Sequence, residues 1–418
     1  MATFILLLII YLAFVSLGVP DGVMGVAWPE MQRTFAVPFE SAGYITAFGT
    51  IGSVTSAFLS GHILKRFGTG IVVCFSCALT GASFLGFFLS GHFAFLLLLA
   101  LPLGLGAGAV DTGLNDYVAR NFTSRHMNWL HASWGLGAFV GPMLMTWAIV
   151  NTGSWRNGYL GVSIIQLSLS VLFLLSLPLW KLPGKRAKLD AAAPMEDHRP
   201  RESGEAATDT NPVVQPAPRT FAQRLLGGFG KIFRMKGLLA GMLLFLFYVG
   251  SETAVGLWSA SYLRFARDVS VENAGLWVSM FYGSITVGRI IAGIFVNRIG
   301  TRKAIWIGVS ISIIGFVLLM IPVATDILCP LALALIGLGF APIYPCAMQD
   351  APIFFGKESA IAIGYEMGCA NIGYAFLPMA VGKIADATTL FVVPIAAFLF
   401  LLLCAASYRV LSHVKAEA

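Results

Sequence analysis

Asp111 and Asn115 are the residues of this sequence whose types and spacing most clearly allow chemistry. They lie in an otherwise apolar stretch that also carries Gly104, Gly106 and Gly108. In a helix, residues four positions apart share a face, and an ionisable group in an apolar helix usually faces a protein interior or a wet cavity. A carboxyl group that alternates between dry and wet surroundings can bind a proton in one and release it in the other. We therefore expect Asp111 to bind protons, and the donor and acceptor of the Asn115 amide to bind a polar solute.

Two further acidic residues lie in apolar stretches and are expected to take part in proton binding. Asp21 follows Pro20, which removes a backbone donor and leaves a carbonyl free to face a ligand. Glu252 lies 231 residues after Asp21. The alternatives are a structural helix-end role for Asp21, and for Glu252 an ion pair with Arg289 or Arg264.

Other polar and aromatic side chains in apolar stretches could contact a solute. His131 can titrate near neutral pH, although helix packing is the alternative. Trp134 lies three residues further, on the same face, and could stack against the apolar side of a sugar. The residues expected to bind substrate are Asn115, His131, Trp134, Tyr248, Arg289, Tyr344, Glu366 and Asn371.

The composition is that of a membrane protein. Of the 418 residues, 57% are hydrophobic and only 11% are charged, whereas a soluble chain has about 25% charged residues. The net charge of +7 is explained by basic cytoplasmic loops, so we expect no nucleic-acid partner. Cys74 and Cys77 form a CxxC in mid-helix without a second pair, which argues against a metal site. No phosphate-binding GxxxxGK[ST] motif occurs, and no cofactor is expected.

Twelve stretches are long and apolar enough to cross a bilayer, which takes roughly 20 residues. The basic residues place both termini in the cytoplasm, because 21 of the 27 then fall on the cytoplasmic side. The N-terminal stretch is expected to be the first helix rather than a removed signal peptide. The predicted spans are 4–28, 41–64, 70–90, 93–119, 127–150, 158–180, 237–262, 273–297, 303–323, 326–348, 358–384 and 387–411.

The chain divides into two halves around a polar segment. Residues 182–236 are rich in Pro, Ala, Glu and Arg and cannot bury a core, so we expect a mostly disordered cytoplasmic linker. The expected domains are an N-terminal six-helix bundle, 1–181, and a C-terminal six-helix bundle, 237–418.

The two halves repeat. The loop Gly61–Gly68 recurs as Gly293–Gly300, an offset of 232 residues. Gly104 matches Gly337 at an offset of 233. In the fifth and eleventh helices, two Gly and Pro pairs match at an offset of 236, namely Gly137 and Pro142 with Gly373 and Pro378. A parallel repeat with a substrate site between the halves near the midplane is a transporter layout, and it predicts that Asp21 and Glu252 face each other.

Several of these motifs resemble the major facilitator superfamily. The two repeated loops look like its signature loop between the second and third helices, although Lys65 and Asn297 replace the usual acid before the arginine. Within the superfamily, FYVGSETAVG at 247–256 and GLGAGAVDTGLNDYV at 104–118 resemble the fucose/glucose/galactose:proton symporter family. This resemblance covers nearly all twelve predicted helices. It implies an all-α membrane protein with the major facilitator fold, twelve transmembrane helices in two six-helix bundles.

The resemblance also implies roles for two of the acids. Asp111 matches the fourth-helix acid of the family, which is a protonation site. The family carries a proton-linked aspartate in its first helix, and when Pro29 is aligned with the family's proline, that position is Gly25 here and Asp21 lies one turn earlier. The implied function is proton-coupled import of a hexose or deoxyhexose by alternating access, by a monomer in the lipid bilayer of the inner (plasma) membrane.

Three other functions compete with this one. Gly137-Ala-Phe-Val-Gly141-Pro142 partly resembles the fifth-helix motif of drug:proton antiporters, which favours proton-driven efflux of amphipathic compounds. A transporter-like sensor would bind the sugar without moving it. A membrane enzyme could use Asp111, His131 and Glu252 as acids and bases, but no nucleophile motif or metal-ligand spacing supports it, and we expect no enzymatic activity.

Overall fold

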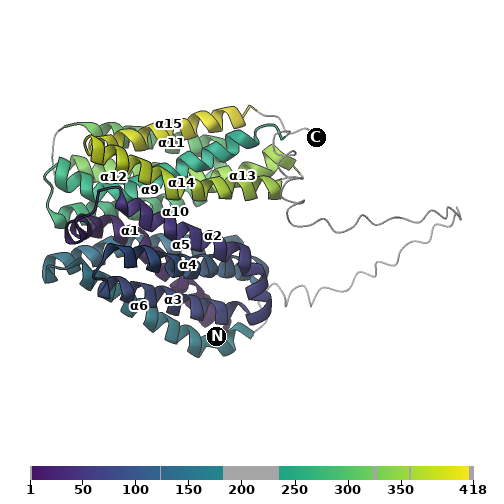
Figure 1. The fold of residues 1–418 in the computed structure, drawn as a ribbon. Coiled ribbons are helices and arrows are strands. Elements are labelled where there is room, and N and C mark those ends of the chain that lie inside the picture. The colour runs from purple at the N-terminus through teal and green to yellow at the C-terminus, as the bar shows by residue number, and fades with distance from the viewer. Residues whose placement is uncertain (1, 123, 182–234, 323–326, 357–358, 414–418) are drawn as a thin grey trace, which may run out of the picture.

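The computed structural model describes residues 2–122, 124–181, 235–322, 327–356 and 359–413. These residues form long helices in two bundles that lie side by side (Figure 1). The predicted linker 182–236 falls outside the described residues except at its last two positions. The N-terminal half contains α1 (Ala2–Phe35), α2 (Ser41–Phe67), α3 (Thr69–Leu89), α4 (Phe93–Asn121), α5 (Ser124–Thr152), α6 (Trp155–Ser176) and the short 3-10 helix η1 (Leu177–Lys181).

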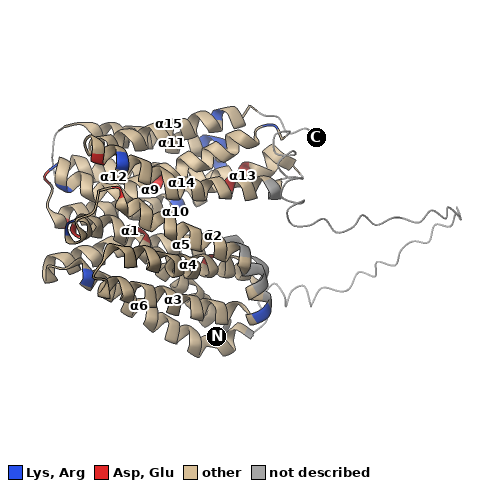
Figure 2. Ribbon diagram, in the orientation of Figure 1, with Lys and Arg blue, Asp and Glu red and all other residues tan. Residues whose placement is uncertain are grey.

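The C-terminal half follows the same order. It contains α9 (Leu238–Ala266), α10 (Val271–Ile299), α11 (Thr301–Met320), α12 (Leu328–Phe340), α13 (Ile343–Phe355), α14 (Ser359–Ala387) and α15 (Val392–Leu411). Ten segments of the described chain are long and apolar enough to cross a membrane, with α12 and α13 counted together. The long helices α2 and α14 complete the bundles and contact each other across the two halves. Lys and Arg lie mostly towards the helix ends, whereas several acidic residues lie inside the bundles (Figure 2).

The tenth predicted span, 326–348, corresponds to Leu328–Phe355 in the structure, which is longer and contains a break. The helix breaks between Phe340 and Ile343, and a second segment continues to Phe355. Pro342 lies in the break, where its ring and its missing N–H interrupt the ladder of backbone hydrogen bonds. The Tyr248 hydroxyl of α9 donates to the Phe340 carbonyl at 3.1 Å, so this break is stabilised from the neighbouring helix.

Equivalent glycines make equivalent contacts in the two halves, which confirms the repeat. Gly68 and Gly300 both have positive φ, 79° and 84°, and both precede the third helix of their half. Because L side chains rarely adopt this backbone conformation, glycine is favoured at both turns. Gly104 lies against the backbone of α2, and Gly337 lies against the backbone of α10.

Gly137 of α5 is packed directly against the Val15 carbonyl of α1. A Cβ atom there would overlap that oxygen, so Gly137→Ala must push the two helices apart. We expect a loss of about 1–3 kcal/mol, which is typical of overpacking, and a lower thermal unfolding midpoint for the purified protein. Gly293→Ala is the matched control, since no atom lies within 4 Å of its added methyl. Equal melting temperatures for the two variants would contradict this packing.

The halves are joined at the end that carries the loops after α1 and α9. There the Arg264 guanidinium of α9 contacts the Glu30 carboxylate of α1 at 2.7 Å. The Phe39 and Trp258 rings lie 4.3 Å apart between centroids, and the Trp258 indole donates to the Pro378 carbonyl at 2.8 Å. Arg264, one of the two partners considered for Glu252, is therefore occupied by Glu30, and this end of the interface is closed.

Candidate substrate and proton site

Asp21 is positioned by close packing of α1 on α5. Gly18 lies against the Trp134 backbone, and Gly22 lies against Pro142 and the Tyr282 ring. These glycines let the helices approach closely enough for side chains to meet. The Trp134 indole Nε1 donates a hydrogen bond of 2.7 Å to Oδ2 of Asp21. Two residues predicted separately from the sequence thus form a direct pair.

Arg289 of α10 continues this pair into the C-terminal half. Its guanidinium carbon lies 5.1 Å from the centroid of the Trp134 ring, a cation–π distance. Its Nη2 lies 3.9 Å from Oε1 of Glu252 in α9, so of the two expected ion-pair partners the structure selects Arg289. We call Asp21, Trp134, Arg289 and Glu252 the central cluster. It runs through α1, α5, α10 and α9 and therefore crosses the interface between the halves.

Two tyrosines border the central cluster on the C-terminal side. Tyr248 is buried beside Arg289 and Glu252, with its hydroxyl directed to Phe340. Tyr344, next to the helix break, donates to the Met367 sulfur at 3.1 Å. The charges of Asp111, Arg289, Glu252 and Glu366 all act on the Tyr344 hydroxyl. Tyr344 therefore lies where acids from both halves converge.

Asp111 and Asn115 form a hydrogen-bonded pair on α4. The Asn115 amide donates to Oδ1 of Asp111 at 2.9 Å and to the Asp111 carbonyl at 3.0 Å. Asp111 is exposed, although it lies inside an apolar segment, and its charge acts on both Asp21 and Tyr344. Asp111 therefore lies at an exposed position from which its charge reaches a residue of each half. Both hydrogen bonds of the Asn115 amide nitrogen go to Asp111 here. The amide oxygen of Asn115 is therefore the group available to a solute.

The other residues predicted to bind substrate are His131, Asn371 and Glu366. His131 is exposed, packs edge-on against Phe14 and lies within electrostatic range of Arg289. Asn371 is exposed on α14 and its amide donates to the Met367 carbonyl of its own helix at 3.0 Å. Glu366 is buried against α9, outside the central cluster.

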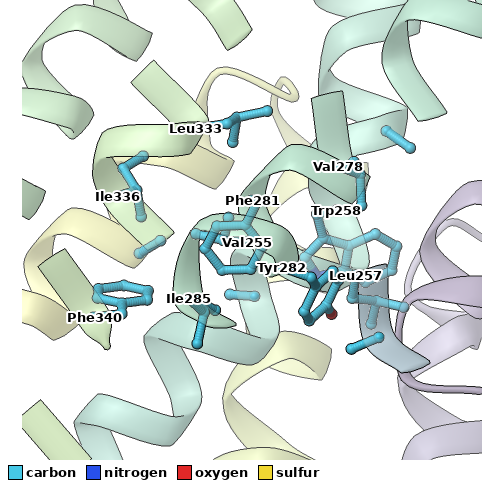
Figure 3. Close-up of a cluster of buried hydrophobic side chains, with 14 of the residues drawn as sticks. Val255, Leu257, Trp258, Val278, Phe281, Tyr282, Ile285, Leu333, Ile336 and Phe340 are labelled. Atoms are coloured by element: carbon cyan, nitrogen blue, oxygen red, sulfur yellow. The ribbon is translucent and has the colours of Figure 1, made fainter. Parts of the chain in front are cut away.

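Two residues of the centre were missed by sequence reasoning. Tyr282 of α10 and Tyr374 of α14 both lie within electrostatic range of Asp21 and Glu252. Figure 3 shows Tyr282 beside Leu257 and Trp258 in the core formed by α9, α10 and α12. Its position seven residues before Arg289, two turns along one face, is the signal that could have identified it.

The central cluster provides two carboxyl groups, one guanidinium and an indole between the two halves. Asp111 supplies a third carboxyl group nearby, and the bordering tyrosines supply hydroxyl groups. Carboxyl groups can take up protons, and the indole and hydroxyl groups can donate to an uncharged polar solute. Within the described ranges, no three His, Cys, Asp or Glu side chains converge as metal ligands would. The chemistry available is therefore proton exchange and polar recognition.

Trp134→Phe tests the link between Asp21 and Arg289. The ring face survives, but the hydrogen bond of 2.7 Å to Asp21 is lost. A hydrogen bond to a charged group contributes about 1.5–3 kcal/mol, so we expect transport to slow by about tenfold or more. Solute flux into proteoliposomes measures this. Trp147→Phe, at an exposed position of the same helix, is the matched control, and equal rates for both variants would remove Trp134 from the mechanism.

The sequence and the fold are similar to those of known transporters. The "Glucose/mannose transporter GlcP" of Bacillus subtilis (strain 168) is 22% identical over 381 residues, which cover 89% of this chain and 86% of that one. The "Fosmidomycin resistance protein" of Escherichia coli (strain K12) is 24% identical over 387 residues, covering 90% and 85%. The crystal structure of a D-xylose-proton symporter superposes with a TM-score of 0.71 at 14% identity, covering 97% of each chain.

The family model of the Major Facilitator Superfamily matches residues 10–378. That range contains the central cluster and most of both helix bundles. Because the match covers most of the chain and the fold agrees, the chain belongs to the Major Facilitator Superfamily and is a multi-pass membrane transporter of a small-molecule solute, not an enzyme.

Proposed function

We propose that this transporter imports a hexose or deoxyhexose together with protons, as the fucose/glucose/galactose:proton symporters that it resembles do. The observation that carries the proposal is the central cluster, in which the Asp21 carboxylate is paired with an indole and lies within electrostatic range of Asp111. Carboxyl groups, aromatic faces and hydroxyls together suit a solute that has hydroxyl groups and an apolar ring face. The likeness to the glucose/mannose transporter supports the same substrate class.

The proposed cycle begins with protonation of Asp111 or Asp21 from outside. Neutralising a carboxylate lowers the cost of closing the site over it, so protonation favours sugar binding and closure. Asp21, Asp111 and Glu252 carry the coupling. Arg289 and Trp134 hold Asp21 and Glu252 in place until the sugar enters. The proton then leaves to the cytoplasm with the sugar.

The conformation observed fits the inward-facing stage of that cycle. The end closed by Glu30 and Arg264 is the outer end if both termini are cytoplasmic, as the basic residues predict. Asp111 and His131 are exposed in this state and lie within electrostatic range of Tyr344 and Arg289 of the other half, respectively. Protein located in the inner membrane as a monomer would then release its sugar on the side that carries the termini.

Proteoliposomes loaded with a pH-sensitive dye test the function directly. We expect acidification of the lumen when fucose, galactose or glucose is added outside, because symport moves protons with the sugar. Protein-free liposomes are the control. No proton movement with any of the sugars would contradict the proposal.

Efflux of amphipathic compounds is the second candidate. It is favoured by the likeness to the fosmidomycin resistance protein and by the Gly137–Pro142 stretch of α5, in which Gly141 packs against the Val19 carbonyl. The same liposomes distinguish the two functions. Proton movement driven by fosmidomycin or a cationic dye, without a response to any sugar, would establish efflux instead.

A further inference from the structure

Glu366 of α14 lies in the interface between α14 and α9 of the C-terminal half. Its side chain is only 1% exposed and lies against Gly241 of α9. A Cβ atom on residue 241 would overlap the Oε1 atom of Glu366. Glycine at this position therefore makes room for a carboxyl group that the central cluster does not use.

The Oε2 atom of Glu366 is buried and has no hydrogen-bond partner. In the described part of the chain, no basic side chain forms an ion pair with it. Asp350 of α13 is a useful contrast, because that buried carboxylate accepts hydrogen bonds from Thr301 at 2.6 Å and Tyr408 at 3.0 Å. Burying a carboxylate without such partners is very costly, so a neutral, protonated Glu366 fits this site and an ionised one does not.

The helices packed against α14 bring few charges towards Glu366. From α13, the Tyr344 hydroxyl lies within electrostatic range, and Asp350 is occupied by Thr301 and Tyr408. On α9, the contact is Gly241, and the next titratable groups along the helix are Tyr248 and Glu252. On α15 they are Cys404, Tyr408 and Arg409, and α2 meets α14 further along, where Gly43 packs on Met379. Arg409 is the one positive charge among these groups; it is exposed and forms no ion pair with Glu366 among the described residues.

The opposite face of α14 is open on both sides of Glu366. Gly364 and Gly368 flank Glu366, are exposed, and have no atom of another element within 4 Å of a Cβ position. Gly373, in contrast, is packed against the Leu246 carbonyl. Gly364 and Gly368 therefore place no steric limit on a movement of this segment, and such a movement would open the α9–α14 interface.

We propose that Glu366 is a second proton-binding site, separate from the central cluster, and that its carboxyl group is protonated in this conformation. Its proton leaves when water reaches the α9–α14 interface, so the transporter moves more protons per solute than the central carboxyl groups alone account for. The inference rests on the proposed proton coupling, since a transporter that moves no protons has no use for such a site.

Infrared spectroscopy of the purified protein tests the site without any solute. We expect Glu366→Gln to remove a carbonyl-stretch band of protonated carboxylic acid at neutral pH. Asp350→Asn is the matched control, because it removes a buried carboxyl group whose two oxygens both accept hydrogen bonds, and its loss should leave the band unchanged. Gly241→Ala should displace the carboxyl group and shift the pH at which the band disappears. An unchanged band in Glu366→Gln would overturn the proposal.

Flux measurements separate this proposal from the proposed function. With the sugar that the wild type transports, Glu366→Gln is expected to lower the number of protons moved per sugar while leaving exchange intact. An unchanged proton count would overturn the second site although symport itself stands. Conversely, a wild type that moves no protons with any solute would remove the symport function, and the infrared result would still show whether Glu366 holds a proton.

Discussion

Arg289→Gln is expected to abolish both sugar exchange and proton-driven uptake. Arg289 is the only member of the central cluster with a positive charge, and it contacts Trp134 of one half and Glu252 of the other. Its removal leaves the Glu252 carboxylate partly buried without its partner and removes the cation–π contact. Loss of one partner from a partly desolvated pair costs about 1–3 kcal/mol, or about tenfold to a hundredfold in the population of the closed state.

Three variants make this measurement specific. Counterflow of radiolabelled sugar in proteoliposomes reports exchange without a proton gradient. Arg289→Lys keeps the charge but loses the planar group that lies over the indole, so we expect partial activity. Glu272→Gln, which removes a charge at an exposed position in the first turn of the same helix, should behave as the wild type. Normal counterflow in Arg289→Gln would show that the cross-half contact is not part of the transport cycle.

The fold was predictable from the sequence because the two halves repeat the same close contacts between helices. Gly104 and Gly337 each bring the fourth helix of their half onto the second, and Gly68 and Gly300 each make the same turn. Repeated glycines mark close helix approaches, which is information that a sequence carries directly. The break at Pro342 was missed because the apolar run continues through it, although proline is the residue that interrupts a helix.

The central cluster was only partly predictable for a geometric reason. Asp21, Trp134, Arg289 and Glu252 were each identified as polar or aromatic groups in apolar helices, and the repeat predicted that Asp21 and Glu252 face each other. Which side chains actually touch depends on helix crossing angles and on how the halves meet, and the sequence does not specify either. The Trp134 link and the proximity of Tyr282 could therefore emerge only from the structure.

Glu366 is a second case in which the sequence identified a residue but not its contacts. The sequence placed it among the residues that could line the substrate site, as an acid in an apolar helix. The structure turns it instead towards Gly241, whose missing side chain is what makes the position possible. Gly241 lies more than one hundred residues before Glu366 on another helix, and no feature of the sequence links the two residues. The structure is therefore needed to show which residues on different helices contact each other.

Asp111→Asn is expected to separate binding from coupling. Asparagine has the same shape, and its oxygen can still accept the hydrogen bond of 2.9 Å from Asn115, so the fold and sugar exchange should survive. It cannot release a proton, so proton-driven accumulation should be lost. A membrane potential of about 100 mV supplies about 2.3 kcal/mol per proton, which corresponds to an accumulation of about 50-fold. Uptake by the variant should stop when the sugar concentrations inside and outside are equal.

The pH dependence gives the same test a second readout. Uptake by the wild type requires a protonated carboxyl group, so its rate should fall as the external pH rises, whereas exchange by Asp111→Asn should be independent of pH. Asn115→Ala is the matched control, because it removes the neighbour and keeps the carboxyl group; we expect weaker sugar binding with accumulation preserved. Accumulation by Asp111→Asn would assign the coupling to Asp21, which is held by Trp134 on the path between the halves. Loss of exchange in Asp111→Asn would instead make Asp111 a direct ligand of the sugar.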